Sequence, residues 1–433
     1  MKSKMNVGVG FVTGRKSFKN LVKTYLENWN ESMLGSGGKC SMNLFVAYDL
    51  QYTKTKVKDY KISDEEILDM VDSAYYLGNA SIANEAEYLI EKEIVTRQEA
   101  KLIFGDGYAM KRNAVLYFAL KNKMDYLIFL DDDEYPIANI KLGESMVWKG
   151  QEVLKTHIKN IKKADMTHGH HCGYISPIPY VEFNEKLTEN EFRIFIESIS
   201  NDIVNWDSVK QKMLDGGISY ADLEIINNET VEYVKEINGM KFVSGANIGF
   251  NLKNLAKIFP FYNPPGARGE DTFLSTMIGE CDIIKVPCYT FHDGFSAYPK
   301  LLLGVLPNKL KAMKADSIIN NKRFLKATIG WIRYKPLLLY ITQRDKYEEE
   351  IQKIKDNLTK VLPKICDYFG TKEYMHILSE LDFFHTHVEE HYQDFEDTKD
   401  TWIKIIQFLN QNETIKKSLK LKNKEFLKIS SKQ

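Results

Sequence analysis

The 433-residue chain has few cysteines, and their spacing follows no motif. The five are Cys40, Cys172, Cys281, Cys288 and Cys366, an odd number without a Cys-x-x-Cys pair. Disulfide scaffolds and structural zinc sites both rely on paired, closely spaced cysteines. The sequence therefore predicts neither, and it favours a reducing, cytoplasmic location.

Long apolar runs and an excess of one charge are also missing. No apolar run approaches the roughly 20 residues that a membrane span needs, and the N-terminal MKSKMNVGVGFVTG lacks the apolar core of a secretory signal. Fifty-nine Lys and Arg balance 59 Asp and Glu, whereas general nucleic-acid binders are usually basic. We therefore expect a globular protein of two or three domains without a nucleic-acid partner.

Strand and helix patterns alternate along the first third of the chain. Apolar stretches predict strands at 5–13, 41–49, 100–107 and 125–133, and helical spacing predicts helices at 14–30 and 108–123. This alternation indicates an α/β fold with a doubly wound, mainly parallel sheet. Ligands of such sheets bind beyond the carboxyl ends of the strands, where Thr13, Asp49, Asp106 and the carboxylates from Asp131 onward stand.

The rest of the chain divides by composition. Residues 180–238 are charged and helical in pattern and read as an insertion, after which strands return at 240–250 and 281–294 around a helix near 269–280. We therefore place a first domain at 1–299. A basic amphipathic segment at 300–345 connects it to an all-helical C-terminal domain at 346–433.

Four consecutive carboxylates, Asp131 to Glu134, follow an apolar strand and precede Pro136. Alternation along an extended backbone places Asp131 and Asp133 on one side. Carboxylate oxygens suit a hard divalent cation, Mg²⁺ or Mn²⁺, which usually keeps open positions for substrate phosphates. The alternative is a solvated acidic loop.

Two later motifs add groups of the same kind. In GARGEDTFLSTM, Glu270 and Asp271 open a predicted helix, where a carboxylate is either a helix cap or an ionised general base. In YTFHDG, His292 ends a predicted strand and is either a packed histidine or a third metal ligand.

Taken in order, the segments VTGRKSFKNLVKTYLENW, GYAMKRNAVLYFALKNKMDYLIFLDDDEYP, FVSGANIGFNL, RGEDTFLSTM and FHDG resemble the family 2 glycosyltransferases of the GT-A fold. The resemblance covers roughly residues 5 to 298 and leaves the 180–238 insertion unmatched. It implies that the 1–299 domain is a GT-A catalytic domain. The first loop departs from the family, since it reads TGRK where TYNR is common.

The resemblance implies a role for each matched residue. Thr13, Gly14, Arg15 and Asp49 match the pocket for the base and ribose of a nucleotide, and Arg112 and Asn113 match the helix that faces its phosphates. Asp131, Asp132 and Asp133 match the DxD element, in which Asp131 and Asp133 bind the metal. His292 matches a metal or diphosphate contact. Ser244, Gly245 and Glu270 match positions around the donor sugar, and Asp271 matches the catalytic base of inverting members.

The function implied is an inverting, metal-dependent transfer of a sugar from a nucleotide diphosphate, with a UDP-sugar favoured and Mn²⁺ or Mg²⁺ as cofactor. The acceptor is expected to be a hydroxyl of a glycan, polymer or lipid-linked glycoconjugate. One alternative is a nucleotidyltransferase, because GVGFVTGRK slightly resembles a phosphate loop. The other is a non-catalytic sugar-binding scaffold.

Two further features remain. His168, His170 and His171 fall in a predicted strand, with His168 and His170 expected on one face. A zinc site needs three or four ligands, so we expect strand histidines near or under the site, with an acceptor contact as the alternative.

Residues 300–346 hold eleven Lys or Arg against two Asp, mixed with apolar residues. Such a segment either packs the C-terminal helices or lies on an anionic membrane at its cytoplasmic face.

Overall fold

The computed structural model of the protein describes residues 4–32, 40–200, 206–294 and 296–430, with the backbone alone for residue 66 and for 412–430. Residues 431–433 of the predicted C-terminal domain, and 201–205 of the predicted insertion, lie outside the described residues.

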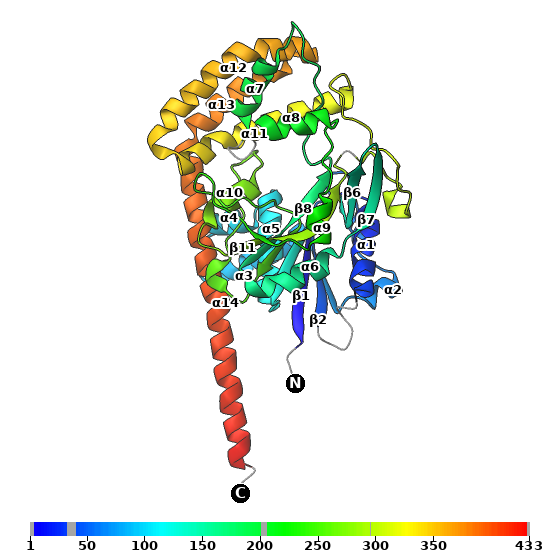
Figure 1. The fold of residues 1–433 in the computed structure, drawn as a ribbon. Coiled ribbons are helices and arrows are strands. Elements are labelled where there is room, and N and C mark those ends of the chain that lie inside the picture. The colour runs from blue at the N-terminus through cyan, green and yellow to red at the C-terminus, as the bar shows by residue number, and fades with distance from the viewer. Residues whose placement is uncertain (1–3, 33–39, 201–205, 295, 431–433) are drawn as a thin grey trace.

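A nine-stranded sheet forms the centre of the N-terminal part (Figure 1). Its order is β3 (Ser73–Leu77), β2 (Cys40–Tyr48), β1 (Met5–Thr13), β4 (Tyr126–Asp131), β10 (Ile248–Asn251), β8 (Met166–Gly173), β11 (Ile283–His292) and β5 (Glu134–Tyr135), and β9 (Glu232–Tyr233) also pairs with β11. The first four strands are parallel, β10 runs against both of its neighbours, and β11 is parallel to β8. The sheet is thus curled and mostly parallel, as the alternating sequence pattern predicts.

Helices cover both faces of this sheet. They are α1 (Phe18–Glu31), α2 (Glu65–Leu68), α3 (Asn79–Glu91), α4 (Arg97–Phe104), α5 (Tyr108–Lys121), α6 (Val153–Asn160), α9 (Leu223–Asn227) and α10 (Glu270–Met277). One hydrophobic core joins α3, α4 and α5 to the sheet, and another joins α1 and α6 to its opposite face. Because both faces are covered, β1 and β2 are mostly apolar and are buried along nearly their whole length rather than at alternate residues. A separate hairpin, β6 (Ile137–Leu142) and β7 (Ser145–Gly150), lies at one end.

One predicted strand is wrong. Residues 100–107 belong largely to α4, which begins at a capping box between Thr96 and Glu99 and buries Ala100, Ile103 and Phe104 on one face. The strand that pairs with β2 is β3, whose sequence SAYYL is short and only partly buried. The strand predicted at 240–250 is reduced to β10, which begins at Ile248.

A helical layer stands beyond the sheet in Figure 1. It contains α7 (Glu189–Ile199), α8 (Trp206–Leu214), α11 (Ile318–Thr342), α12 (Tyr347–Phe369), α13 (His376–Thr386) and the start of α14 (Val388–Ser430). The predicted helices after residue 346 are confirmed. Phe192 and Phe195 of α7 share one hydrophobic core with Phe324 of α11 and Leu358 of α12, so the insertion and the C-terminal helices pack as one layer.

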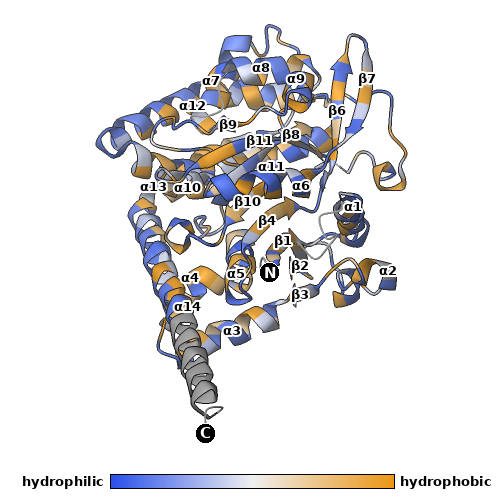
Figure 2. Cartoon of the chain, turned by 60° about the horizontal axis from the view of Figure 1, so that its bottom comes forward, coloured by the Kyte–Doolittle hydropathy of each residue, from blue (hydrophilic) through white to orange (hydrophobic). Residues whose placement is uncertain are grey.

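The long helix α14 ties this layer to the sheet part. It runs along α4 and past α3 in Figure 1, and the fully buried Trp402 donates from Nε1 to the carbonyl of Ile258 at 2.9 Å. Figure 2 shows apolar colour concentrated on strands such as β4, while α14 carries both polar and apolar residues. Among the described helices, none combines the length and the apolar character that crossing a membrane would require.

Candidate functional site

The acidic run lies at the carboxyl end of β4, where Asp131 is the last strand residue and Asp132 and Asp133 form a turn before β5. The turn ends the extended alternation, so the reason we gave for placing Asp131 and Asp133 together is wrong. Side-chain exposure falls from 28% for Asp131 to 12% for Asp133. The run is therefore partly buried, and its charges require partners.

The loop after β1 supplies one set of partners. Arg15 donates from Nε to Asp132 at 3.0 Å and from Nη2 to Asp133 at 2.6 Å. Thr13 donates from its hydroxyl to Asp132 at 2.7 Å. Burial and the neighbouring Asp133 charge raise the pKa of Asp132 to about 7 against the opposing effect of Arg15. The TGRK loop thus binds the acidic run directly.

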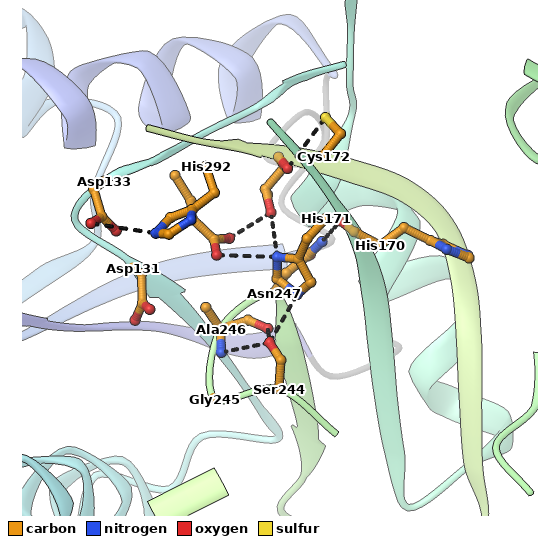
Figure 3. Close-up of polar contacts among 12 residues, drawn as sticks. Asp131, Asp133, His170, His171, Cys172, Ser244, Gly245, Ala246, Asn247 and His292 are labelled. Carbon is orange, nitrogen blue, oxygen red and sulfur yellow. Dashed lines mark hydrogen bonds and ion pairs between the residues drawn. The ribbon is translucent and has the colours of Figure 1, made fainter. Parts of the chain in front are cut away.

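His292 ends β11 and faces Asp133, with 3.5 Å between Nε2 and Oδ2 (Figure 3). Its other ring nitrogen, Nδ1, lies 2.6 Å from the carbonyl oxygen of Tyr174 and donates to it. Burial alone would lower the pKa of His292, but the charge and hydrogen bond of Asp133, the Glu134 charge and the Tyr174 carbonyl together outweigh it and raise the pKa to about 9. Burial would likewise raise the pKa of Asp133, and His292 and Arg15 together hold it below its usual range.

Arg112 connects the acidic run to the other two motifs. Its side chain on α5 is buried, with Nη2 at 2.9 Å from Asp131 and Nε at 3.6 Å from Glu270. A further Nη1 bond reaches the carbonyl of Gly245. The guanidinium of Arg112 thus holds β4, the Ser244–Asn247 loop and the start of α10 in one arrangement, while only 2% of its side chain is exposed for contact with a ligand.

Glu270 and Asp271 form the first turn of α10, as predicted, after Gly269 with φ +96°. The backbone amide of Thr272 donates to Asp271 at 2.8 Å. Burial raises the pKa of Asp271, although Arg112 opposes this. Burial and the adjacent Asp271 also raise the pKa of Glu270, to about 7. Asp271 is partly exposed and can accept a proton.

A second network joins Ser244 to β8 and β5. The Ser244 hydroxyl lies 2.8 Å from Nε2 of His171, and Nδ1 of His171 lies 3.1 Å from Glu134 (Figure 3 shows the Ser244 contact). Thr290 donates to the same carboxylate. Since a carboxylate accepts, His171 donates from Nδ1. Its Nε2 contacts the Ser244 hydroxyl, which also donates to the carbonyl of Ala246 at 2.9 Å. The chain Glu134–His171–Ser244 therefore fixes the Ser244–Asn247 loop beside the acidic run.

The histidines of β8 do not pair as predicted, because His168 shares its contact with His171 and not with His170. His168 and His171 both contact Ser244, because Nε2 of His168 accepts from its backbone amide at 3.2 Å. His170 instead stacks on Tyr289 of β11. The pairing of β8 with β11 is irregular between Lys285 and Tyr289. The expectation of strand histidines near the site is confirmed.

Three predicted site residues have their described contacts outside the acidic run. The side chain of Asn113 is fully buried and exchanges two bonds with the backbone of Phe261, which is a structural role. Asp49 is 40% exposed, with Lys111 at 3.8 Å. Gly14 packs so closely on Tyr52 that a Cβ would lie 2.5 Å from it.

Sequence reasoning missed two members of the cluster. Tyr108 donates to Asp131 at 3.0 Å from the first residue of α5. Arg323 of α11 donates to the carbonyl of Gly294, next to His292, and its charge acts on Asp133. The excess of basic residues after Lys300 was the available signal for Arg323, but it did not identify which residue returns to the sheet.

Asp131 and Asp133 offer oxygen donors of the kind that Mn²⁺ or Mg²⁺ prefers, and Nε2 of His292 can add a nitrogen donor once it has lost the proton that faces Asp133. The contacts of Arg15 and His292 use Oδ2 of Asp133, and those of Tyr108 and Arg112 use Oδ1 of Asp131. One oxygen of each carboxylate is thus left to a cation, so the residue types fit. Within the described ranges, no group of three or more His, Cys, Asp or Glu lies together in a way that could hold a metal ion.

Comparison with known proteins adds no name to this arrangement. No protein-family model matches the chain. No curated protein matches it either.

Proposed function

We propose that the protein is an inverting, metal-dependent glycosyltransferase of the GT-A fold that uses a nucleotide-diphosphate sugar, most simply a UDP-sugar. The observation that carries the proposal is the meeting of Asp131, Asp133, Arg112, Asp271 and His292 at the carboxyl edge of a mostly parallel sheet. These residues come from separate strands and helices, and an acidic loop alone would not require them to converge.

The chemistry needs one group that removes a proton. In the reaction an acceptor hydroxyl forms a bond to the anomeric carbon, the bond from that carbon to the donor phosphate breaks, and the acceptor proton leaves. Asp271 is suited to take this proton, because burial raises its pKa toward the operating range while Arg112 keeps it available as a carboxylate. Attack from the face opposite the phosphate inverts the anomeric centre.

The chemistry also needs charge stabilisation for the departing nucleoside diphosphate. A divalent cation, when bound, supplies this by neutralising the phosphate oxygens. Asp131, Asp133 and His292 are the residues that would hold it. Arg15 and Arg323, which act electrostatically on Asp133, add positive charge to the same region.

Ser244 and Gly245 are proposed to line the donor sugar, and Asp49 with Thr13 to border the nucleotide. The buried positions of Asn113 and Arg112 limit them to supporting roles. A nucleotidyltransferase is less well supported, because Arg15 is engaged with Asp132 and Asp133 and is not directed into a phosphate loop of its own.

The proposal is tested by nucleotide binding. A thermal-shift screen of nucleoside diphosphates with and without Mn²⁺ should reveal one nucleotide that raises the melting temperature only when metal is present. In Asp133→Ala this shift should disappear. The variant should remain folded, because the backbone carbonyl of Asp133, which accepts from Asp293 at 3.0 Å, is unchanged.

Glu144→Ala, at the exposed turn between β6 and β7, is the matched control and should behave like the wild type. A metal-dependent shift that persists in Asp133→Ala would remove Asp133 from the metal site. The absence of any stabilising nucleotide in the wild type would count against a nucleotide-sugar enzyme.

A further inference from the structure

The segment after His292 contains a stretch of chain with one sign of charge. Between residues 294 and 315 there is no Asp or Glu, while Lys300, Lys309, Lys311 and Lys314 all occur. All four lysines are exposed. A positive surface of this kind attracts anionic partners.

The middle of this stretch projects three apolar side chains into solvent. Leu303, Val305 and Leu306 are 74%, 56% and 44% exposed. Gly304 between them turns with φ +76°, and nothing lies within 4 Å of where its Cβ would be. Exposed large apolar residues on soluble proteins usually occur singly. Three within four residues at a turn therefore indicate a binding surface.

The base of the same loop is firmly held. Leu301 is buried, and Leu302 packs against the core that contains α1. On the far side, Trp148 of β7 donates from Nε1 to the carbonyl of Pro307 at 2.8 Å, and the hydroxyl of Tyr298 accepts from the amide of Lys311 at 2.7 Å. The apolar tip is therefore presented by a fixed base and is not a loose loop that folds back onto the protein.

We propose that the loop from Lys300 to Lys311 is a docking surface for an anionic membrane, with Leu303, Val305 and Leu306 entering the interface and the lysines contacting lipid headgroups. Exposed apolar side chains contribute burial in the acyl boundary, and each lysine near an anionic surface adds attraction that salt weakens. A second copy of the chain is less suited to this surface, because two such loops would bring lysines against lysines.

The apolar residues in the middle of α11 are not part of this surface. Phe324, Leu325 and Ile332 are buried in the helical layer, so the packing alternative holds for that part of the basic segment. Ile318 and Ile319 at the start of α11 are exposed and are not included in the proposed surface. The loop begins eight residues after His292. Tyr174 links the two, because its carbonyl accepts from Nδ1 of His292 and its hydroxyl donates to the carbonyl of Lys311, so docking would bring the candidate site close to a bilayer. A site close to a bilayer favours a lipid-linked acceptor for the sugar. This inference about the acceptor is the only one here that rests on the proposed function.

Co-sedimentation with vesicles of phosphatidylcholine, with and without phosphatidylglycerol, tests the surface independently of activity. We expect binding only to vesicles that contain phosphatidylglycerol, and weaker binding at high salt. The double variant Leu303→Glu/Val305→Glu should bind about tenfold more weakly or worse, because it replaces inserted apolar groups with charges that the lipid repels.

Ile403→Glu is the matched control, since Ile403 is 52% exposed on α14 and α14 lies on the other side of the sheet from this loop in Figure 1. It should bind like the wild type. Equal binding to both vesicle types, no binding to either, or an unchanged double variant would overturn the proposal. So would a dimer that the double variant disperses, because it would assign the surface to a second copy.

The nucleotide-induced thermal shift, measured on the same samples, separates the two proposals. The double variant should retain the shift of the wild type, because Leu303 and Val305 lie outside the candidate site. Vesicle binding without any nucleotide-induced shift would leave the membrane surface standing and would remove the transferase.

Discussion

Asp271 stands at the start of α10 with its carboxylate bound by the next backbone amide. If it is the general base, Asp271→Asn should lower turnover by roughly 10²–10⁴-fold, the usual contribution of proton removal. Asparagine has nearly the same shape and can keep the amide contact, so binding of the nucleotide donor should change little. Turnover and the donor dissociation constant of the variant, measured together, test this assignment. An equal loss of turnover and donor affinity would assign Asp271 to a helix cap instead of a base.

His171 offers a test of the network that holds the Ser244–Asn247 loop. His171→Ala removes one of the two donors to the buried carboxylate of Glu134, since Thr290 remains, and it removes the imidazole contact of the Ser244 hydroxyl. The expected cost is about 1–3 kcal/mol in free energy of unfolding, measured by urea denaturation. His171→Gln should recover part of it. An alanine variant as stable as the wild type would show that the network contributes nothing to the fold.

The sequence identifies the acidic run, the GED carboxylates and His292, because each follows an apolar strand or opens a helix. It does not identify the partners that fix them. Arg323 reaches the site from more than 180 residues beyond Asp133 in the chain, and no local pattern encodes such a contact. Asn113 shows the converse, since a polar residue beside Arg112 serves the backbone of Phe261 instead of a ligand.

At the scale of single elements, helix α6 and strand β8 carry histidines that are buried in the neutral form. His157 bridges Thr167 at 2.7 Å and Asn247 at 2.8 Å, and burial lowers its pKa to about 4. Burial also lowers the pKa of His168, and that of His170 to about 3. These imidazoles bind protons more readily in the unfolded chain, so acidification below their ordinary pKa favours unfolding.

For His157 alone, the loss between roughly pH 7 and pH 5 should be about 2 kcal/mol. Stability rises with pH across this window, because the unfolded state holds the extra proton. His157→Gln removes the titrating group, so its unfolding free energy should depend on pH less steeply than that of the wild type by this amount. Other groups titrate alike in both proteins and cancel. Parallel pH profiles would show that His157 is not buried and neutral.

Helix α14 is attached to the sheet part through Trp402, whose indole is buried and bonded to the carbonyl of Ile258. Trp402→Ala should cost about 3–5 kcal/mol in unfolding free energy, the usual cost of removing a large buried aromatic side chain. Ile403→Ala, at the neighbouring exposed position, should cost little. Urea denaturation of the two variants makes the comparison. Equal effects would mean that α14 does not dock on the sheet part.

Sequence patterns predicted elements well where tertiary packing agreed with local preference. The strands β1, β2, β4 and β11 are long and apolar, and each was recognised. The strand prediction at 100–107 failed because the short apolar run in AKLIFG fits either a strand or a buried helix. The capping box of Thr96 and Glu99, which favours a helix, begins before this run. The short, half-buried β3 carries too little apolar character to stand out.

At the scale of the whole molecule, the helical layer and the sheet part are not independent. The core that holds α7 to α11 and α12 also includes Phe273 of α10, two residues from Asp271. Tyr334 of α11 packs against that Phe273 ring with centroids 6.3 Å apart. The sequence could mark the insertion and the C-terminal helices as separate additions, but their common packing depends on contacts across more than a hundred residues, which periodicity does not report.

The central claim is that the acidic run and Asp271 serve the transfer of a sugar from a nucleotide diphosphate. The most direct measurement is the identity of the nucleotide product that the purified protein releases from a panel of nucleotide sugars with Mn²⁺. The account predicts a nucleoside diphosphate, released by the wild type and nearly abolished in both Asp133→Ala and Asp271→Asn. The absence of any nucleoside diphosphate product, or its release at an unchanged rate from both variants, would contradict it.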